Sequence, residues 1–188
     1  EEVNGATTSV EIGNLTNGTQ YTFTVVASNE AGSSDISDVS NAVIPATTST
    51  APQISNLVVG NGKITVTWIP PDGTEGNEIT GYTVRASPGV ASMEVNGATT
   101  SVEVTGLTNG TSYTFTVTAT NEQGDTPSAP SISIKPRTVP DKPTNVSGVA
   151  GNTQVNVSWD VPSSDGGSPI TGYVVAVFPG GSSVEVGD

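Results

Sequence analysis

The chain contains no cysteine and no histidine among its 188 residues. Without thiols it can form neither a disulfide framework nor a zinc–thiolate site, so packing has to provide its stability. Without imidazole, Ser-His-Asp and Cys-His catalysis are both excluded. No glycine loop with a lysine that could cradle a phosphate occurs either. The sequence therefore offers no catalytic residue, no metal ligand set and no cofactor site.

Basic residues are also scarce: 5 Lys and Arg stand against 18 Asp and Glu, a net charge of −13. This charge repels nucleic acid and anionic membranes, so neither is an expected partner. No apolar run is long enough to insert into a membrane. We interpret the acids as solubilising loop residues rather than as a calcium site. A pair of carboxylates for glycoside hydrolysis would need a cleft, whereas the acids stand in turns and loops, among them Asp72, Glu75, Glu78 and Asp165.

The sequence repeats itself with a period of 91 to 92 residues. Ten residues, EVNGATTSVE, occur at 2–11 and again at 94–103. Further along, Trp68 and the segment 79–82 recur 91 residues later, at Trp159 and 170–173. Such a period is the signature of tandem structural modules. It divides the chain into the C-terminal half of one module (1–45), a complete module (51–137) and the N-terminal half of another (140–188).

Apolar and polar residues alternate along the complete module, which predicts half-buried strands. The alternating segments are 64–68, 82–84, 102–104 and 113–119. Threonines fill the alternate positions, where a β-branched side chain favours extended backbone. No segment has the three-and-four spacing of an amphipathic helix.

Four of the five Asn-Gly pairs are interpreted as turns between strands. We expect tight hairpins at Asn61-Gly62 and Asn96-Gly97, because this pair tolerates positive φ. The pairs at 17–18 and 109–110 precede an aromatic strand, where the chain is expected to cross between sheets. Seven strands in about 90 residues fit an immunoglobulin-like β-sandwich, with Trp68 and Trp159 between the sheets. Tyr21 and Tyr113 have the spacing of a tyrosine corner, in which the hydroxyl bonds nearby backbone.

Together these residues resemble the fibronectin type III family, in the bacterial extracellular form, over nearly the whole chain. The resemblance implies tandem all-β sandwiches with an extracellular or cell-surface location and no activity of their own. It departs from integrin-binding members, because the last loop reads Gln123-Gly124-Asp125 and Ala31-Gly32-Ser33 instead of Arg-Gly-Asp. The residues that match the family pattern are Pro52, Trp68, Tyr82, Val84, Leu107, Thr111, Tyr113, Ala119 and Asn121, with Leu15, Tyr21, Ala27 and Asn29 in the first part and Pro143, Trp159, Tyr173 and Val175 in the third.

The two linkers differ in composition. The first, 45–52, is polar and is expected to lack fixed structure. The second, 136–143, contains three prolines and is expected to be an extended, stiffer spacer.

Half-modules expose unpaired edges and an apolar face, so neither is expected to be stable alone. Three explanations are open: the segment is a window of a longer array, a neighbouring chain supplies the missing strands head to tail in a filament, or the two halves close on each other. The partners expected are neighbouring copies of the same module, with a polysaccharide or a surface protein as the alternative.

Three functions follow from this interpretation. The first is a structural module of an extracellular stalk, fibre or filament. The second is a module that binds carbohydrate or protein, which clustered exposed aromatic residues would favour; Phe178 stands nearly alone outside the core set. The third is a spacer of a secreted bacterial enzyme or adhesin.

Overall fold

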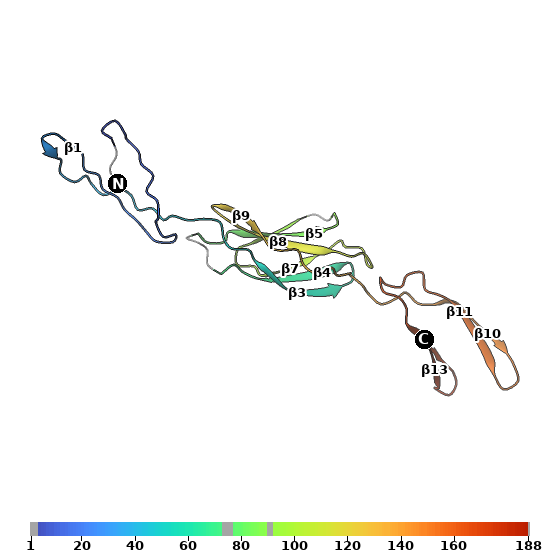
Figure 1. The fold of residues 1–188 in the computed structure, drawn as a ribbon. Helices are drawn as coiled ribbons and strands as arrows, with labels where there is room; N and C mark the ends of the chain where they lie inside the picture. The colour runs from blue at the N-terminus through green and yellow to red at the C-terminus, as the bar shows by residue number, and fades with distance from the viewer. Residues whose placement is uncertain (1–3, 73–76, 90–91, 188) are drawn as a thin grey trace.

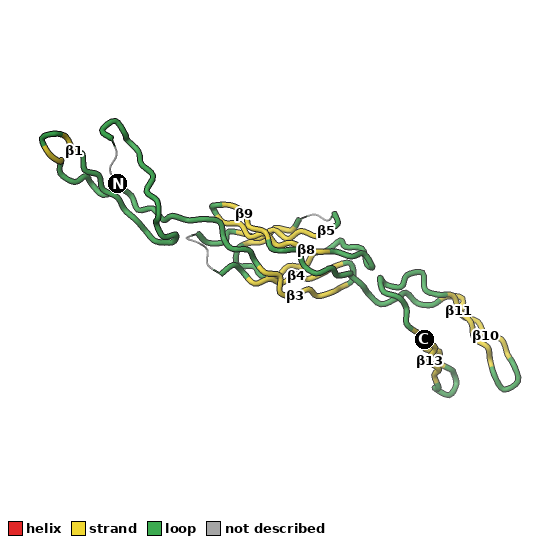
Figure 2. The backbone as a smooth tube through the Cα atoms, in the orientation of Figure 1, coloured by secondary structure: helices red, strands yellow, loops and turns green. Residues whose placement is uncertain are grey.

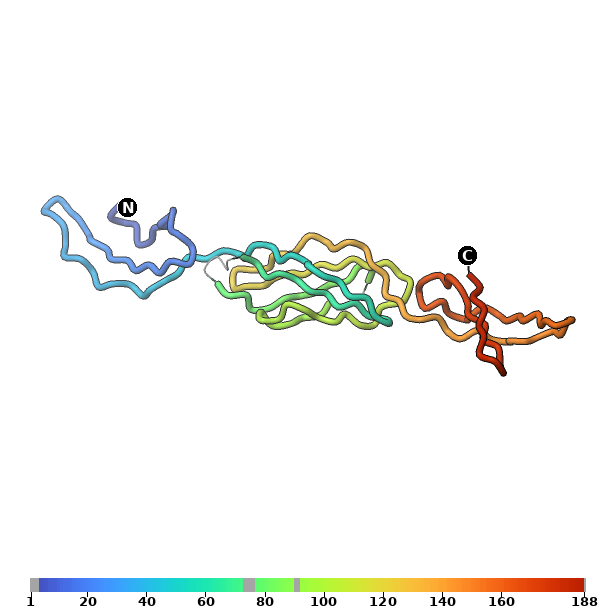
Figure 3. The backbone as a smooth tube through the Cα atoms, turned by 90° about the horizontal axis from the view of Figure 1, so that it is seen from below, coloured from blue at the N-terminus to red at the C-terminus, as the bar shows by residue number. Residues whose placement is uncertain are grey.

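The computed structural model describes residues 4–72, 77–89 and 92–187, and these residues form strands and loops without any helix. Three parts follow one another along the long axis of the molecule (Figure 1). The view turned by 90° shows the same order, with the packed part in the middle (Figure 3). Most strand residues belong to the middle and last parts, whereas the first part is largely loop (Figure 2).

The middle part is a β-sandwich of two antiparallel sheets, as predicted. One sheet has the order β3-β4-β7 and the other the order β6-β5-β8-β9. Hairpins join β3 to β4 and β8 to β9, and the chain changes sheets between β4 and β5, between β6 and β7 and between β7 and β8. The strands are β3 (Gln53–Gly60), β4 (Lys63–Ile69), β5 (Gly81–Ser87), β6 (Met93–Asn96), β7 (Ser101–Val104), β8 (Thr114–Asn121) and β9 (Gly124–Pro127).

Residues that alternate along β4, β5 and β8 fill the space between the sheets. Trp68 is 2% exposed, and its ring centroid lies 5.2 Å from that of Tyr82 on the facing sheet. The predicted burial of Trp68 is therefore confirmed. Large side chains that meet in one dry layer account for most of the stability of such a module. The buried apolar set is Ile64, Val66, Trp68, Tyr82, Val84, Ala86, Val104, Leu107, Tyr113, Phe115, Val117 and Ala119.

The Asn-Gly turns differ in role. Asn61-Gly62 forms the predicted hairpin between β3 and β4, with Gly62 at φ 64°. The prediction for Asn96-Gly97 is wrong, because β6 and β7 belong to different sheets and do not pair. Glycine is required at 97 for space: a Cβ there would lie 1.8 Å from the backbone oxygen of Ile79.

After β9 the chain continues along the edge of β8 with a three-residue period that sequence analysis missed. Ser128 and Ser131 each donate their backbone N–H to a β8 carbonyl, at 2.7 and 2.8 Å, and each hydroxyl oxygen accepts a β8 N–H, at 3.0 and 2.9 Å. The segment ends at the bridge between Tyr113 and Ile134. In both pairs the serine hydroxyl thus takes the place of the serine carbonyl that a regular antiparallel ladder would use as acceptor. An edge of this kind offers no continuous row of free backbone groups to another strand.

The first part, residues 4–45, repeats this serine pattern. Phe23, Val25 and Ala27 donate their N–H groups to the hydroxyls of Ser40, Ser37 and Ser34, at 2.9 to 3.0 Å. The only regular strands among the described residues of this part are β1 (Ser28–Asn29) and β2 (Gly32–Ser33).

The third part consists of two hairpins. One pairs β10 (Thr144–Ala150) with β11 (Val155–Asp160), and the other pairs β12 (Gly172–Ala176) with β13 (Ser183–Gly187). Trp159 packs on Tyr173 with a centroid distance of 5.2 Å, like the pair in the complete module. The expectation of a dry interior is wrong for Trp159, which is only half-buried. The strands that cover Trp68 in the complete module have no equivalent among the residues 140–187.

Candidate interaction surfaces

The turn between β8 and β9 corresponds to the loop that carries ligand motifs in integrin-binding sandwiches. In this chain, the side chains of the residues at its two ends accept hydrogen bonds from the turn and from β8. The Oδ1 atom of Asn121 accepts the N–H groups of Gln123 and Gly124, at 3.0 and 3.1 Å. The Oδ1 atom of Asp125 accepts the hydroxyl of Thr120 at 2.6 Å. Asn121 is 4% exposed. The loop is thus a closed turn without a basic side chain.

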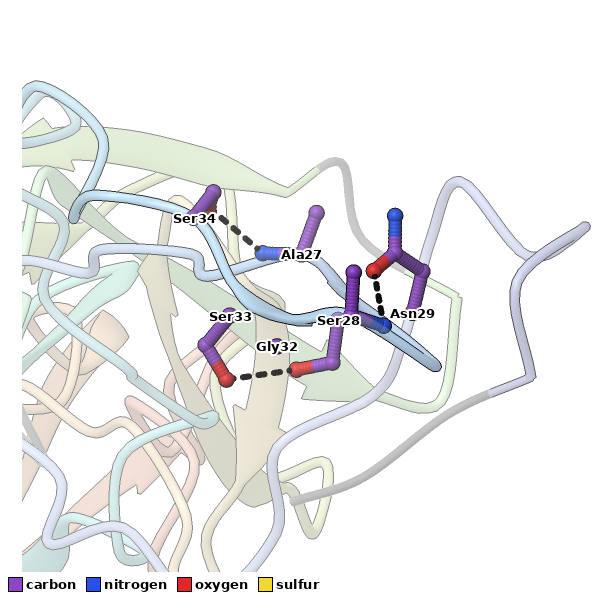
Figure 4. Close-up of a pocket in the computed structure, with 7 residues that line it drawn as sticks. Ala27, Ser28, Asn29, Gly32, Ser33 and Ser34 are labelled. Atoms are coloured by element: carbon purple, nitrogen blue, oxygen red, sulfur yellow. Dashed lines mark hydrogen bonds between the residues drawn. The ribbon is translucent and has the colours of Figure 1, made fainter.

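The equivalent turn of the first part, between β1 and β2, is also self-contained (Figure 4). Asn29 Oδ1 accepts the N–H of Ala31 at 2.9 Å, and the hydroxyls of Ser28 and Ser33 lie 3.1 Å apart. Short, uncharged side chains line the shallow hollow at this turn. It has neither the aromatic walls nor the convergent charges that a specific small-molecule site uses.

The first linker is held by the complete module, contrary to the expectation of a segment without fixed structure. Asn121 donates its Nδ2 hydrogen to the carbonyl of Thr47 at 2.9 Å, and Thr126 donates its hydroxyl to the carbonyl of Ser49 at 2.9 Å. Ser49 is only 4% exposed. The polar composition of the linker could not show this, because the contacts come from Asn121 and Thr126, far along the chain.

The second linker is held by the third part. Thr138 donates its N–H to the carbonyl of Gly166 at 2.8 Å, and Asp141 donates its N–H to the carbonyl of Ser164 at 2.9 Å. The hydroxyl of Ser163 donates to the Asp141 carboxylate at 2.8 Å. The loop between β11 and β12 therefore lies against this linker.

Acidic side chains do not converge on a site in the described part of the chain. Asp72, Glu78 and Asp165 are exposed, and Glu75 lies outside the described residues. Asp165 accepts the N–H of Gly167 at 2.8 Å and so serves a turn. No group of metal-ligating side chains occurs within residues 4–72, 77–89 and 92–187. Within the same ranges, no helix has the length and apolar character needed to span a bilayer.

Both predicted tyrosine corners are present. Tyr113 accepts the backbone N–H of Thr108 through its hydroxyl at 3.1 Å and is 6% exposed. Tyr21 accepts the N–H of Thr16 at 3.0 Å, and this bond lowers the pKa of its hydroxyl. Burial instead raises the pKa of the Tyr82 hydroxyl. These tyrosines are thus part of the scaffold and not of a ligand platform.

Exposed aromatic residues do not cluster. Phe178 is 83% exposed and is the one aromatic among the strongly exposed large apolar side chains of the described residues. Phe178 lies shortly after β12, and its counterpart in the complete module is Ser87. Both residues precede a Pro-Gly pair. This turn therefore offers a sugar one exposed ring and not a row of aromatic side chains.

The family model for the fibronectin type III domain matches residues 1–43 and 50–135. The chain belongs to the fibronectin type III family. Fibronectin type III modules are commonly non-catalytic accessory modules, and they typically lie in extracellular proteins.

Relatives of this fibronectin type III chain come from archaea, bacteria and animals. A Kelch domain-containing protein of Saccharolobus solfataricus is 35% identical over 67% of the chain and 17% of its own length. Neogenin of Rattus norvegicus is 30% identical over 93% of the chain and 14% of its own length. Chitinase A1 of Niallia circulans is 35% identical over 68% of the chain and 19% of its own length. The chain thus corresponds to less than a fifth of each of these relatives.

Proposed function

We propose that the chain is a non-catalytic structural segment of a tandem fibronectin type III array, which serves as a stalk or spacer in an extracellular bacterial protein. The observation that carries this proposal is the 91-residue repeat, because a module that recurs at constant length adds a constant length to the array. The self-contained turns and the loops without convergent acids also support it. They leave the surface of the complete module without a built ligand site in the described residues.

Scattering of chains of different length tests the spacer function. One further copy of residues 51–141 would be inserted, and the maximum dimension measured by small-angle X-ray scattering before and after. Strands of 7 to 8 residues rise about 25 Å, so each copy is expected to add roughly 25–40 Å. A maximum dimension that does not grow with the added copy would contradict a spacer.

We further propose that a second copy of this chain completes the open faces of the first and third parts. The third part of one copy would then supply the strands that the first part of the other copy lacks. The pairing of β5 with β8 sets Tyr82 opposite Ala119 and Val84 opposite Val117. Applied to the repeat, it would set Tyr173 opposite Ala27 and Val175 opposite Val25. The pairing of β4 with β7 transfers in the same way and would set Val155 opposite Ile12 and Val157 opposite Val10, so apolar residues meet apolar residues at the core-facing positions. Donated strands of this kind extend head to tail when the contact does not close on itself.

Sedimentation velocity tests the completion by a second copy. We expect the sedimentation coefficient of the chain to increase with concentration, and Val25→Asp to abolish the increase because it places a charge in the shared core. Thr24→Asp, on the opposite face of the same segment, is the matched control and should leave the association intact. A single monomeric species at micromolar concentration would contradict the completion, although the chain would still be a spacer.

An accessory role in a larger enzyme is the second candidate, because one relative is named a chitinase and the chain matches 19% of it. In that case the chain itself binds polysaccharide through Phe178. Retention on insoluble chitin or cellulose, lost in Phe178→Ala, would favour this function over a pure spacer. Absence of retention would leave the spacer as the better account.

A further inference from the structure

The linkers leave almost no free chain between neighbouring modules. In the first linker, the Pro45 carbonyl accepts the N–H of Gly18 from its own module at 3.0 Å. The carbonyl of Thr47 is already bonded to Asn121 of the following module. Only Ala46 lies between these two fixed points. A tether with one unconstrained residue cannot act as a flexible hinge.

The second linker is tied in the same way. The Arg137 N–H donates to the carbonyl of Gly60 in the complete module at 3.2 Å, and the next residue, Thr138, donates to Gly166 of the following part at 2.8 Å. Here no residue separates the bond to one module from the bond to the next. Pro136 is also fixed, since its carbonyl accepts the N–H of Gly110 at 2.9 Å.

The neighbouring modules also touch directly, backbone against backbone. A Cβ at Gly167 would lie 2.4 Å from the N atom of Gly110, and a Cβ at Gly166 would lie 2.3 Å from the carbonyl oxygen of Thr138. Gly166 is buried. The two glycines therefore fit at this joint because they lack side chains, and their positive φ values of 72° and 91° also favour glycine.

The two linkers occupy the same place in the repeat. Thr47 and Thr138 are separated by one 91-residue period, as are Pro45 and Pro136. The first linker shows the contact with the β8–β9 turn, and the second shows the contact with the loop that follows the tryptophan strand. Each joint is therefore held by its own contact from the part of the chain that follows it.

We infer that each linker is a fixed joint, clamped in the first case by the β8–β9 turn of the following module and in the second by the loop after the tryptophan strand β11, so that neighbouring modules keep one relative orientation. This goes beyond the proposed function, because a chain with mobile linkers could still be a spacer. The array is then a rod with a defined direction at each joint rather than a string of freely rotating modules.

Backbone ¹⁵N relaxation on the full chain tests the joint. Residues 47–50 are expected to have order parameters near those of a strand, about 0.85, whereas a flexible tether would give values below about 0.6. Flexible values in the unmodified chain would overturn the inference.

Two substitutions remove the clamp on the first linker and keep the turn that provides it. Asn121→Asp retains the acceptor for Gln123 and Gly124 but loses the donor to Thr47, and Thr126→Val removes the donor to Ser49. The double variant is expected to lower the order parameters of residues 47–50 below about 0.6. Asn29→Asp, at the equivalent position of the first part, should change nothing there. Unchanged order parameters in the double variant would overturn the assignment of the clamp.

The second joint has a glycine control with the same backbone conformation. Gly106 has φ 74° with open space around the added Cβ, whereas Gly166 has φ 72° and no room. Gly166→Ala is therefore expected to mobilise Thr138 and Asp141, and Gly106→Ala to leave them ordered. Equal order parameters at these two amides in both variants would overturn the joint.

Discussion

The same five residues, YTFTV, occur in the complete module and in the first part, but their side chains are buried to different extents. In the complete module, Phe115 and Val117 are 0% exposed. In the first part, Val25 is 71% exposed, and Phe23 is half-buried. The hydrogen bonds to the serine edge are the same in both places. The local pattern thus sets the backbone pairing, and only the strands of the facing sheet create the core.

The third part leads to the same conclusion from the other half of the module. Val155, the counterpart of the fully buried Ile64, is 61% exposed. The aromatic pair of Trp159 and Tyr173 nevertheless keeps the geometry of its counterpart, with centroids 5.2 Å apart in both modules. Local contacts within each half are therefore present without the complete core, but most of the apolar burial needs both halves.

Truncation of phenylalanine to alanine should give the largest difference between the two copies of YTFTV. Phe115→Ala removes a fully buried ring and is expected to lower the free energy of unfolding of the complete module by about 3–5 kcal/mol. Phe23→Ala, the same change in the same local sequence, should lower it by less than about 0.5 kcal/mol, because that ring is outside the complete module. Urea unfolding followed by the fluorescence of Trp68, with Trp159→Phe as background, measures both. Equal losses would contradict the account.

The tyrosine corner gives a smaller effect. Tyr113→Phe leaves the backbone N–H of Thr108 without its acceptor and is expected to cost about 1–2 kcal/mol in the same assay. Tyr21→Phe should leave this transition unchanged, since Tyr21 lies in the first part. A cost for Tyr21→Phe as large as that for Tyr113→Phe would show that the first part unfolds together with the complete module.

The hydroxyl of Tyr82 gives the smallest effect at neutral pH and a larger one in alkali. It is buried and has no hydrogen-bond partner among the described residues, so Tyr82→Phe should change stability by less than about 0.5 kcal/mol at pH 7.

Burial raises the pKa of the Tyr82 hydroxyl above the ordinary value near 10, so the folded state binds this proton more tightly. The contribution of Tyr82 to the free energy of unfolding is then constant below pH about 10 and is lost as pH rises towards the raised pKa. Unfolding at a series of pH values should show this fall in the parent chain and less of it in Tyr82→Phe, and an unaltered fall would contradict it.

Much of the fold could be predicted from the sequence. Alternation over residues 64–68 and 113–119 fixed the faces of β4 and β8, because a strand places every second side chain on one side. The hydrogen bond of Tyr113 could be predicted as a tyrosine corner, because Tyr113 follows Leu107 by six residues. The Asn96-Gly97 turn was misjudged, since the pair has the sequence of a hairpin turn but is needed for a close approach to Ile79.

The edge segment and the joints could not be predicted from strand alternation. The serines of the edge recur every third residue, at 34, 37 and 40 and again at 128 and 131, a signal that a search for period two passes over. The linker contacts depend on side chains far away in the sequence, such as Asn121 opposite Thr47. Composition alone describes a linker as polar, whereas its order depends on the module that follows.

Amide hydrogen exchange at Val25 and Val117 tests the central claim most directly. Both amides follow a threonine in the same five-residue sequence, so their intrinsic exchange rates are the same, and both N–H groups donate to a serine hydroxyl. At a concentration where the chain is monomeric, Val117 is expected to be protected by the global stability of the complete module, about 5–10 kcal/mol, and Val25 by close to none. Equal protection of the two amides in the monomer would contradict the claim that the facing sheet, and not the strand sequence, makes the core.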